Sequence, residues 1–211
     1  MSSTPDLLPA LRDQDRFLVQ QVLKPIANEY RISIPAPGST EEGDEVLYVR
    51  QKRMKIKEDI RFRVPGDEQG HVFMIKAKTV FEFAGRYDVL DERGEKIGDI
   101  AKDFKKSLLR SQWVVRDAQE NVVLQARESS VLVALIRRFA DLLPDIGGLL
   151  ALIPFNFTLF VDDPDEEAGS YQRVLGKLRD RYVLELSPAL AGADRRLVLA
   201  QAVALDALQD R

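Results

Sequence analysis

LVLAQAVALDALQ, residues 197–209, is the stretch of sequence that decides the fold. It contains no Gly and no Pro, and its residue types favour a helix. From Leu197 to Leu208 only Gln201 and Asp206 are polar, so this helix lacks a hydrophilic face and must be buried in protein or in a membrane. Twelve residues cover only about 18 Å, whereas a bilayer-spanning helix needs about 20 residues. We therefore predict a helix buried inside the protein, and a β-barrel is the simplest structure that surrounds a single helix.

Three segments in the middle of the chain share a pattern that predicts a β-hairpin. Each has an aromatic residue, a Val two positions later, a turn rich in Gly, Asp and Glu, and a second apolar run. The segments are RFRVPGDEQGHVFMIKA from Arg61, RYDVLDERGEKIGDIAK from Arg86 and QWVVRDAQENVVLQARE from Gln112. Their aromatic residues lie 25 and 26 residues apart, and a repeat of this size indicates one supersecondary unit used several times.

The remaining strands follow from the same reasoning. The meander is expected to run from about Val46 to Arg127, and the runs FNFTLFV and YQRVLGKL predict a later hairpin. A last strand, RYVLEL, ends at Ser187, and Asp194 is the expected N-cap of the terminal helix. We therefore predict a mainly β fold of about nine to twelve antiparallel strands around a C-terminal helix, with one amphipathic helix between strands.

Residues 1–45 have a different composition. Several Pro residues and the acidic run EEGDE predict an N-terminal arm that is partly flexible, with a short helix around residues 13–27. The barrel domain is then expected to occupy residues 46–211.

The hairpin pattern, followed by RDRYVLEL and DRRLVLAQAVALDALQ, resembles the LURP-one-related proteins, which share a superfamily with the tubby C-terminal domain and the phospholipid scramblases. The similarity covers residues 46–211. It implies a barrel of about twelve strands with the C-terminal helix threaded through its centre. Tubby domains bind phosphoinositides through basic surface residues, and scramblases carry a cysteine-rich segment and a spanning helix. This chain has neither of those two features, which argues against lipid scrambling.

Composition narrows the function further. The net charge is −3. The chain has no cysteine, and this absence excludes disulfides, thiolate catalysis and cysteine-ligated zinc. The start, MSSTPDLLPA, has no secretory signal pattern. We therefore expect a cytoplasmic protein that can also associate peripherally with a membrane. We also expect a monomer.

Motifs for catalysis and cofactors are scarce. His71, the single histidine, falls in a predicted hairpin turn without an accompanying nucleophile motif, and no glycine-rich phosphate loop is present. We predict no enzymatic activity and no cofactor. The acidic turn at residues 162–167 offers weak calcium candidates, but Ala168 stands where an EF-hand needs Gly. Those weak metal candidates are Asp163, Asp165 and Glu167.

A basic run is the strongest candidate site. YVRQKRMKIKEDIRFRV, residues 48–64, holds seven Lys and Arg against two acids. Alternation along two strands that turn at Glu58–Asp59 would place five cations on one outward surface, where they would attract lipid headgroups or phosphates. The alternative is a strand face that only aids solubility. Nucleic acid is disfavoured, because the aromatic residues needed for stacking alternate to the opposite face. The five cations are Arg53, Lys55, Lys57, Arg61 and Arg63.

An amphipathic segment follows at residues 131–155. At 100° per residue its apolar side chains fill one side, opposite Arg137, Arg138 and Asp141, up to Pro144. It either closes one mouth of the barrel or lies on a membrane or a partner. The apolar candidates are Leu132, Leu135, Ile136, Phe139 and Leu143.

The predicted function is a non-enzymatic binding module that recognises anionic lipid headgroups or phosphates through a basic barrel face. The alternative is a protein-interaction scaffold that uses residues 1–45 or residues 131–155 as its docking surface. Scrambling and catalysis are the least favoured functions.

Overall fold

The computed structural model describes residues 4–23, 27–52, 59–77, 85–103, 111–129, 156–161, 166–174 and 181–208, and the structural statements that follow concern these residues.

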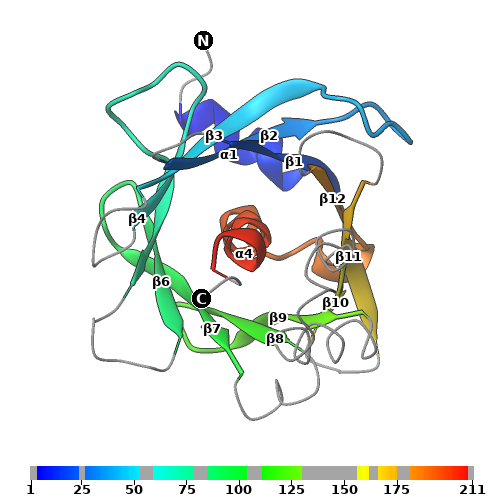
Figure 1. The fold of residues 1–211 in the computed structure, drawn as a ribbon. Coiled ribbons are helices and arrows are strands. Elements are labelled where there is room, and N and C mark those ends of the chain that lie inside the picture. Colours follow the sequence, from blue (N-terminus) through cyan, green and yellow to red (C-terminus); the bar gives the residue numbers. More distant parts are fainter. Residues whose placement is uncertain are drawn as a thin grey trace, which may run out of the picture.

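Twelve strands and two α-helices make up the described chain (Figure 1). The first half contains α1 (Thr4–Arg12), β1 (Arg16–Leu23), β2 (Ala27–Ile34), β3 (Asp44–Lys52), β4 (Asp59–Arg63), β5 (Phe73–Ala77) and β6 (Arg86–Asp91). The second half contains β7 (Lys96–Lys102), β8 (Gln112–Asp117), β9 (Val122–Glu128), β10 (Phe157–Phe160), β11 (Glu167–Arg173), β12 (Arg181–Leu186), the 3₁₀ turn η2 (Pro188–Leu190) and α4 (Arg195–Ala207).

The strands form one closed antiparallel barrel, so the predicted fold class is confirmed. Each strand pairs with the next along the chain, and β12 pairs with β1 to close the wall. The three hairpins expected from the repeat are β4–β5, β6–β7 and β8–β9. Closure leaves no strand edge unpaired, which removes the usual route to edge-to-edge aggregation.

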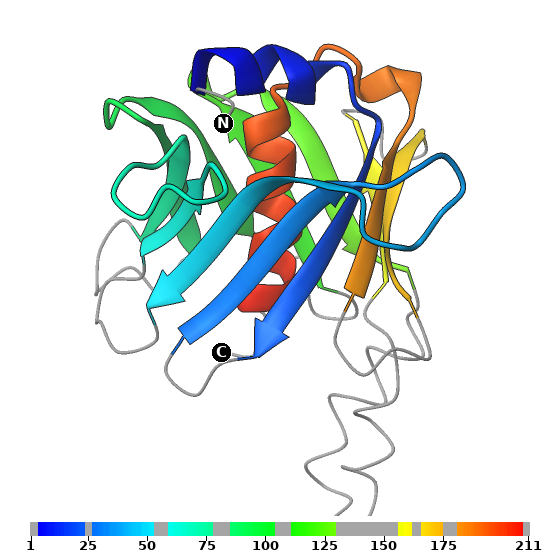
Figure 2. The ribbon, with the colours of Figure 1, turned by 90° about the horizontal axis from the view of Figure 1, so that it is seen from above.

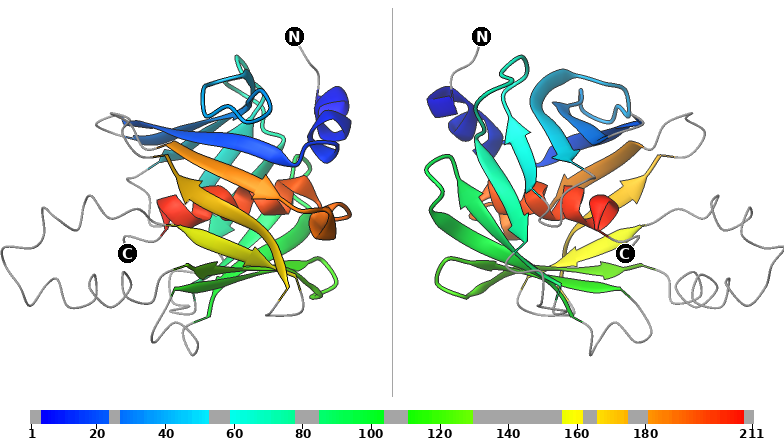
Figure 3. Two further views of the ribbon diagram at one scale, coloured as in Figure 1. Left: turned by 90° about the vertical axis from the view of Figure 1, so that its right-hand side faces the viewer. Right: turned by 60° about the vertical axis from the view of Figure 1, so that its left-hand side comes forward.

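Helix α4 passes through the centre of the barrel, as its apolar sequence predicted (Figures 1 and 3). Asp194 is the N-cap, because its side chain accepts a hydrogen bond from the backbone N–H of Arg196. Every residue from Leu197 to Leu205 is buried. Asp206 accepts a hydrogen bond from the hydroxyl of Tyr182 at 3.1 Å, so one polar residue of the helix ties it to β12.

Residues 16–34 differ from the sequence prediction. The helix expected around residues 13–27 is wrong, because β1 and β2 occupy this region and the barrel begins at Arg16 rather than at Val46. Phe17 and Val19 point into the core, and residues 16–20 of β1 pair with residues 181–185 of β12. The helix of this region, α1, lies earlier and packs Leu7 and Leu11 against the core.

The connection between β2 and β3, residues 35–43, is tied to the outside of β12 (Figure 2). Arg181 donates to the backbone oxygen of Thr40 at 3.1 Å and pairs with Glu41 at 3.3 Å and Glu42 at 3.0 Å. Arg181 is only 8% exposed. The acidic run expected in a flexible arm therefore provides the partners of a largely buried cation.

The barrel has two rims, and α4 begins at one of them and ends at the other. Odd-numbered strands end at the helix-end rim, where α4 also ends, and even-numbered strands end at the helix-start rim, where α4 begins (Figure 2). The helix-end rim is marked by Leu23, Lys52, Ala77, Lys102, Glu128 and Arg173. The helix-start rim is marked by Ile34, Arg63, Asp91, Asp117, Phe160 and Leu186.

Candidate functional site

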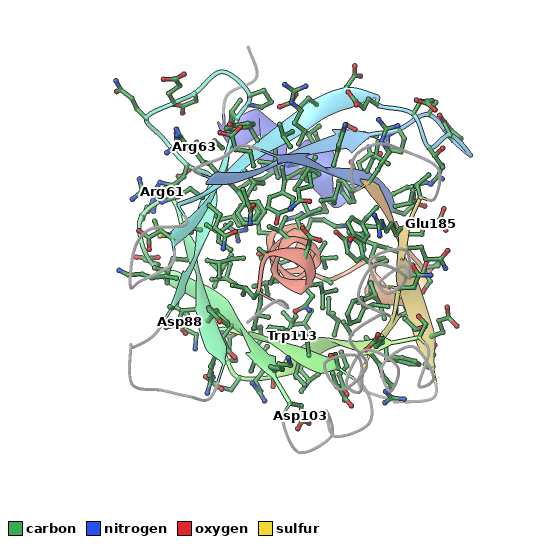
Figure 4. The ribbon with its side chains drawn as sticks, viewed as in Figure 1. Arg61, Arg63, Asp88, Asp103, Trp113 and Glu185 are labelled. Atoms are coloured by element: carbon green, nitrogen blue, oxygen red, sulfur yellow. The ribbon has the colours of Figure 1, made fainter. Side chains whose placement is uncertain are left out.

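Strand β4 carries two of the predicted cations on the outer surface. Ile60 and Phe62 are buried in the core, and Phe62 stacks on Phe73 of β5 with ring centroids 4.1 Å apart. Arg61 and Arg63 alternate with them and lie outside the wall (Figure 4). The period-two alternation read from the sequence is therefore observed for this strand.

The strand beside β4 is not the expected one. Asp59 is the first residue of β4 and pairs with Lys76, so it lies in a strand and not in the turn that the sequence suggested. Arg61 lies opposite Arg50, and Arg63 lies opposite Tyr48. Sequence reasoning counted Arg50 within the basic run but did not select it as a site residue, although it alternates with the buried Val49.

A third arginine extends this surface to β2. Arg31 lies opposite Tyr48 in the β2–β3 ladder, so Arg31, Arg50 and Arg61 follow three adjacent strands. Their side chains are 49%, 51% and 37% exposed. These three residues are called the arginine belt below. Alternation within NEYRISI could have identified Arg31, but the sequence alone does not show that β2 lies beside β3.

Each arginine of the belt has an acidic neighbour at a long distance. Arg31 lies 3.8 Å from Glu45, Arg50 lies 3.7 Å from Glu29, and Arg61 lies 3.7 Å from Asp59. The Arg31–Glu45 and Arg61–Asp59 pairs are partly exposed, and such pairs contribute only about 0–1 kcal/mol, whereas the side chain of Glu29 is only 3% exposed. A phosphate could therefore replace the contacts of Arg31 and Arg61 at little cost, since guanidinium groups bind phosphate in a bidentate manner.

Tyr48 lies between Arg31 and Arg50 on the same face. Burial raises the pKa of the Tyr48 hydroxyl to about 12, and a hydrogen bond to Glu29 adds to this shift. The hydroxyl is therefore neutral at physiological pH. It adds a neutral polar group to the arginine belt without adding negative charge.

Arg63 and His71 belong to a different environment. Arg63 Nη1 donates a hydrogen bond to the backbone oxygen of Glu68 in the β4–β5 connection, which lies at the helix-start rim. Burial, together with the charges of Arg61 and Arg63, lowers the pKa of His71. His71 is therefore a neutral imidazole at pH 7, next to arginines.

Several predicted candidates lie outside the described residues. These are Arg53, Lys55, Lys57, Leu132, Leu135, Ile136, Phe139, Leu143, Asp163 and Asp165. Glu167, the remaining metal candidate, is exposed at the start of β11. Within the ranges that the structure describes, no group of three or more His, Cys, Asp or Glu side chains could hold a metal ion.

The strand ends show where these segments attach. Lys52 and Asp59 lie at the helix-end rim, so residues 53–58 are joined to this rim at both ends. Glu128 and Phe157 lie at the same rim, and residues 129–156 join them. Residues 53–58 and residues 129–156 therefore attach at the same end of the barrel, which the sequence could not establish.

The two rims differ strongly in charge. The connections at the helix-end rim contain twelve Lys and Arg and six Asp and Glu. The connections at the helix-start rim, including residues 187–194, contain one Lys or Arg and twelve Asp and Glu. This difference is hidden in a net charge of −3. The connections that begin and end at the helix-end rim are therefore net basic in sequence, and those at the helix-start rim are net acidic.

A second charge cluster lies on the outside of β6, β7 and β8. Asp99 is fully buried and contacts Arg86 at 2.6 Å, Lys96 at 3.2 Å and Arg116 at 3.2 Å. Glu120 contacts Arg86 at 2.6 Å, and hydrogen bonds to Asp99 and Glu120 raise the pKa of Arg86. Because these cations are already paired at short distances, the cluster stabilises the wall and offers less to a ligand than the arginine belt does.

The fold and the site define a class of protein. A closed barrel of twelve antiparallel strands, filled by its own C-terminal helix, is the tubby-like fold. The chain belongs to the LURP-one-related family, whose model matches residues 45–206. This match runs from the start of β3 into α4 and leaves out β1 and β2, which close the barrel. No curated protein matches the chain in sequence. In the described part of the chain, neither helix is long and apolar enough to cross a bilayer.

Proposed function

We propose that this protein is a binding module that docks on anionic membranes through the helix-end rim and the arginine belt. The interior of the barrel is occupied by α4, so a ligand has to be bound on the outer surface or at the rims. The observation that carries the proposal is the difference in charge between the connections at the two rims, with residues 53–58 attached at the rim whose connections are net basic. On this proposal the protein binds without catalysing a reaction.

The proposed contact has a basic part and an apolar part. Arg53, Lys55 and Lys57 would contact headgroup phosphates together with Arg61, and Arg63 would lie furthest from the surface. Each basic residue near an anionic bilayer contributes about 1 kcal/mol, so several are needed for stable docking. The apolar side chains of residues 131–143, attached at the same rim, would add burial in the interface.

The scaffold alternative has less support. One of its two docking surfaces was a flexible arm at residues 1–45, but residues 16–34 form β1 and β2. The other, residues 131–155, lies outside the described residues. Deleting the arm would therefore remove two strands of the barrel, and a loss of partners after such a deletion would report unfolding. The described part left for docking is α1, which uses Leu7 and Leu11 to pack against the core.

Vesicle flotation tests the proposal. The protein should float with vesicles of phosphatidylcholine and phosphatidylserine at low salt, remain behind with pure phosphatidylcholine, and be released at high salt. The double variant Lys55→Glu/Lys57→Glu should reduce the bound fraction about tenfold or more. Arg31→Glu/Arg61→Glu should reduce it as well, because it reverses two charges of the belt whose acidic partners are partly exposed.

Arg93→Glu is the matched control, since it reverses the one cation among the connections of the opposite rim. It should leave binding unchanged. Inorganic phosphate, added at constant ionic strength, distinguishes two modes of binding. It would release the protein from vesicles if a pocket binds single headgroups, and it would not if the whole surface binds the membrane. The proposal is wrong if anionic vesicles fail to retain the protein at low salt, or if Arg93→Glu weakens binding as much as the double variants do.

A further inference from the structure

A cavity lies at the helix-start rim between α1 and the first residues of α4. Its volume is about 350 Å³, which is near the lower end of the range for ligand pockets. It is on the opposite end of the barrel from the proposed membrane surface. The cavity is lined by Leu8, Leu11, Arg12, Ala191, Gly192, Ala193, Asp194, Arg195 and Arg196.

Arg195 supplies a buried cation to this cavity. It is 7% exposed, and it donates to the backbone oxygens of Gln14 at 2.9 Å, Leu190 at 2.6 Å and Ala193 at 3.2 Å. These bonds use Nε and Nη1, and Nη2 makes no hydrogen bond to a described residue. No described carboxylate forms an ion pair with Arg195, and burial lowers its pKa. The guanidinium is therefore held rigidly by Nε and Nη1, and its Nη2 and its positive charge are available to a ligand.

The other cations differ in how far they are neutralised. Arg196 is occupied by Asp194, whose carboxylate accepts from its Nε and Nη2 at 2.6–3.1 Å. Arg12, on the α1 side of the cavity, is exposed and makes no ion pair with a described residue. Asp15 and Asp194 are the acids whose charges act on Arg195, and neither forms an ion pair with it. Two guanidinium groups from different elements therefore line this cavity without an ion pair to a described carboxylate.

Apolar side chains complete the walls. Leu8 and Leu11 of α1 and Ala191 and Ala193 of the 187–194 connection line the cavity beside the arginines. An anion with a short hydrocarbon chain would contact both the arginines and the apolar side chains of this cavity. Arginine binds carboxylate through paired N–H groups, and the chain buries apolar surface. We infer that this cavity is a binding site for a small carboxylate on a short apolar chain, held between Arg12 and Arg195.

Amide chemical shifts in the full-length ¹⁵N-labelled protein test this site. Hexanoate should shift the amides of residues 191–196 in a saturable manner and leave the amides of β4 unaffected. Hexanol and hexylamine, which have the same chain without the negative charge, should bind at least tenfold more weakly. Acetate should also bind more weakly than hexanoate, because it lacks the chain that contacts Leu8 and Leu11.

Two variants avoid disturbing the structural role of Arg195. Arg12→Glu should weaken hexanoate binding about tenfold or more, since it replaces one of the two cations. Ala191→Trp should block the cavity, and because Ala191 is exposed the variant keeps the core intact. Arg31→Glu, the same charge change on the arginine belt, should have no effect. The inference is overturned if hexanoate causes no saturable shift, if hexanol binds equally well, or if Arg31→Glu weakens binding as much as Arg12→Glu does.

Discussion

Gly98 of β7 lies against the side chain of Leu197 in the first turn of α4. A Cβ atom at position 98 would be 2.8 Å from Leu197 Cδ2 and 2.2 Å from the backbone oxygen of Arg116 on β8. Both distances are far shorter than normal contacts. The missing side chain of Gly98 therefore allows the buried helix to approach the wall at this level.

Gly98→Ala should lower the free energy of unfolding by about 1–3 kcal/mol, because the new methyl group overpacks the contact between helix and wall. Urea denaturation monitored by tryptophan fluorescence measures the change. Gly192→Ala is the control, since a Cβ there meets nothing within 4 Å. Equal stability of Gly98→Ala and the parent protein would show that α4 does not lie as close to β7 as described.

The central helix and the hairpins could be predicted because their signals are local. The apolar run at residues 197–208 specifies burial on all sides, and each hairpin carries its own turn. In two hairpin turns, Asp91 and Asp117 accept hydrogen bonds from the backbone N–H groups two and four residues later. This explains why Asp recurs at the start of these turns.

The first strand of the barrel could not be predicted, because it is defined by pairing with residues that are distant in the sequence. RFLVQQVL contains apolar residues at spacings that fit a helix or a strand. What makes it a strand is pairing with β12, for example Phe17 with Leu184, far away in the sequence. The same limit applies to the site. The outward direction of Arg61 was predictable by alternation, but its position opposite Arg50 depends on a register that only the folded chain shows.

Asp99→Asn should destabilise the protein by about 2–3 kcal/mol, because a fully buried carboxylate is removed from three cations that are partly exposed. The measurement is the urea midpoint at pH 7. Asp88→Asn is the matched control, since Asp88 contacts Lys96 alone among these cations, at 3.4 Å. It should cost about 1 kcal/mol or less. A similar loss in both variants would contradict a special role for Asp99.

Glu120 should make stability depend on acid pH. It adopts a φ of 66°, a left-handed conformation that is uncommon outside glycine, and contacts Arg86 and Lys96. Hydrogen bonds to these cations lower its pKa below the ordinary value of 4.5. A carboxylate whose pKa is lowered in the folded state stabilises the fold at pH values above its ordinary pKa. This contribution is lost as the pH falls through the folded-state pKa.

Glu120→Gln should therefore be less stable than the parent protein at pH 7, and the difference should shrink as the pH falls below about 4.5. Thermal unfolding between pH 3 and pH 7 records the two curves. Glu92→Gln, at an exposed acid of the β6–β7 turn, should run parallel to the parent protein. Parallel curves for Glu120→Gln as well would mean that the ion pairs do not form.

Arg181→Ala should release the connection between β2 and β3. The variant removes the donor to Thr40 and the partner of Glu41 and Glu42. The amides of residues 35–43 should then exchange with deuterium at least tenfold faster, because the connection can leave the surface without unfolding of the barrel. The β6–β7 turn, residues 92–95, should be unaffected and serves as the internal control. An unchanged exchange rate in residues 35–43 would show that Arg181 does not hold this connection.

The central claim is that α4 fills the barrel, so that binding takes place on its exterior. The chain has no cysteine, so a single introduced thiol reports on one position alone. Ala202, in the middle of α4, is 2% exposed, and Ala189 in η2 is exposed. In the native protein the thiol of Ala189→Cys should react with a water-soluble thiol reagent at once, and that of Ala202→Cys should react only as fast as the whole protein unfolds. Rapid reaction of the Ala202→Cys thiol under native conditions would contradict the sealed barrel.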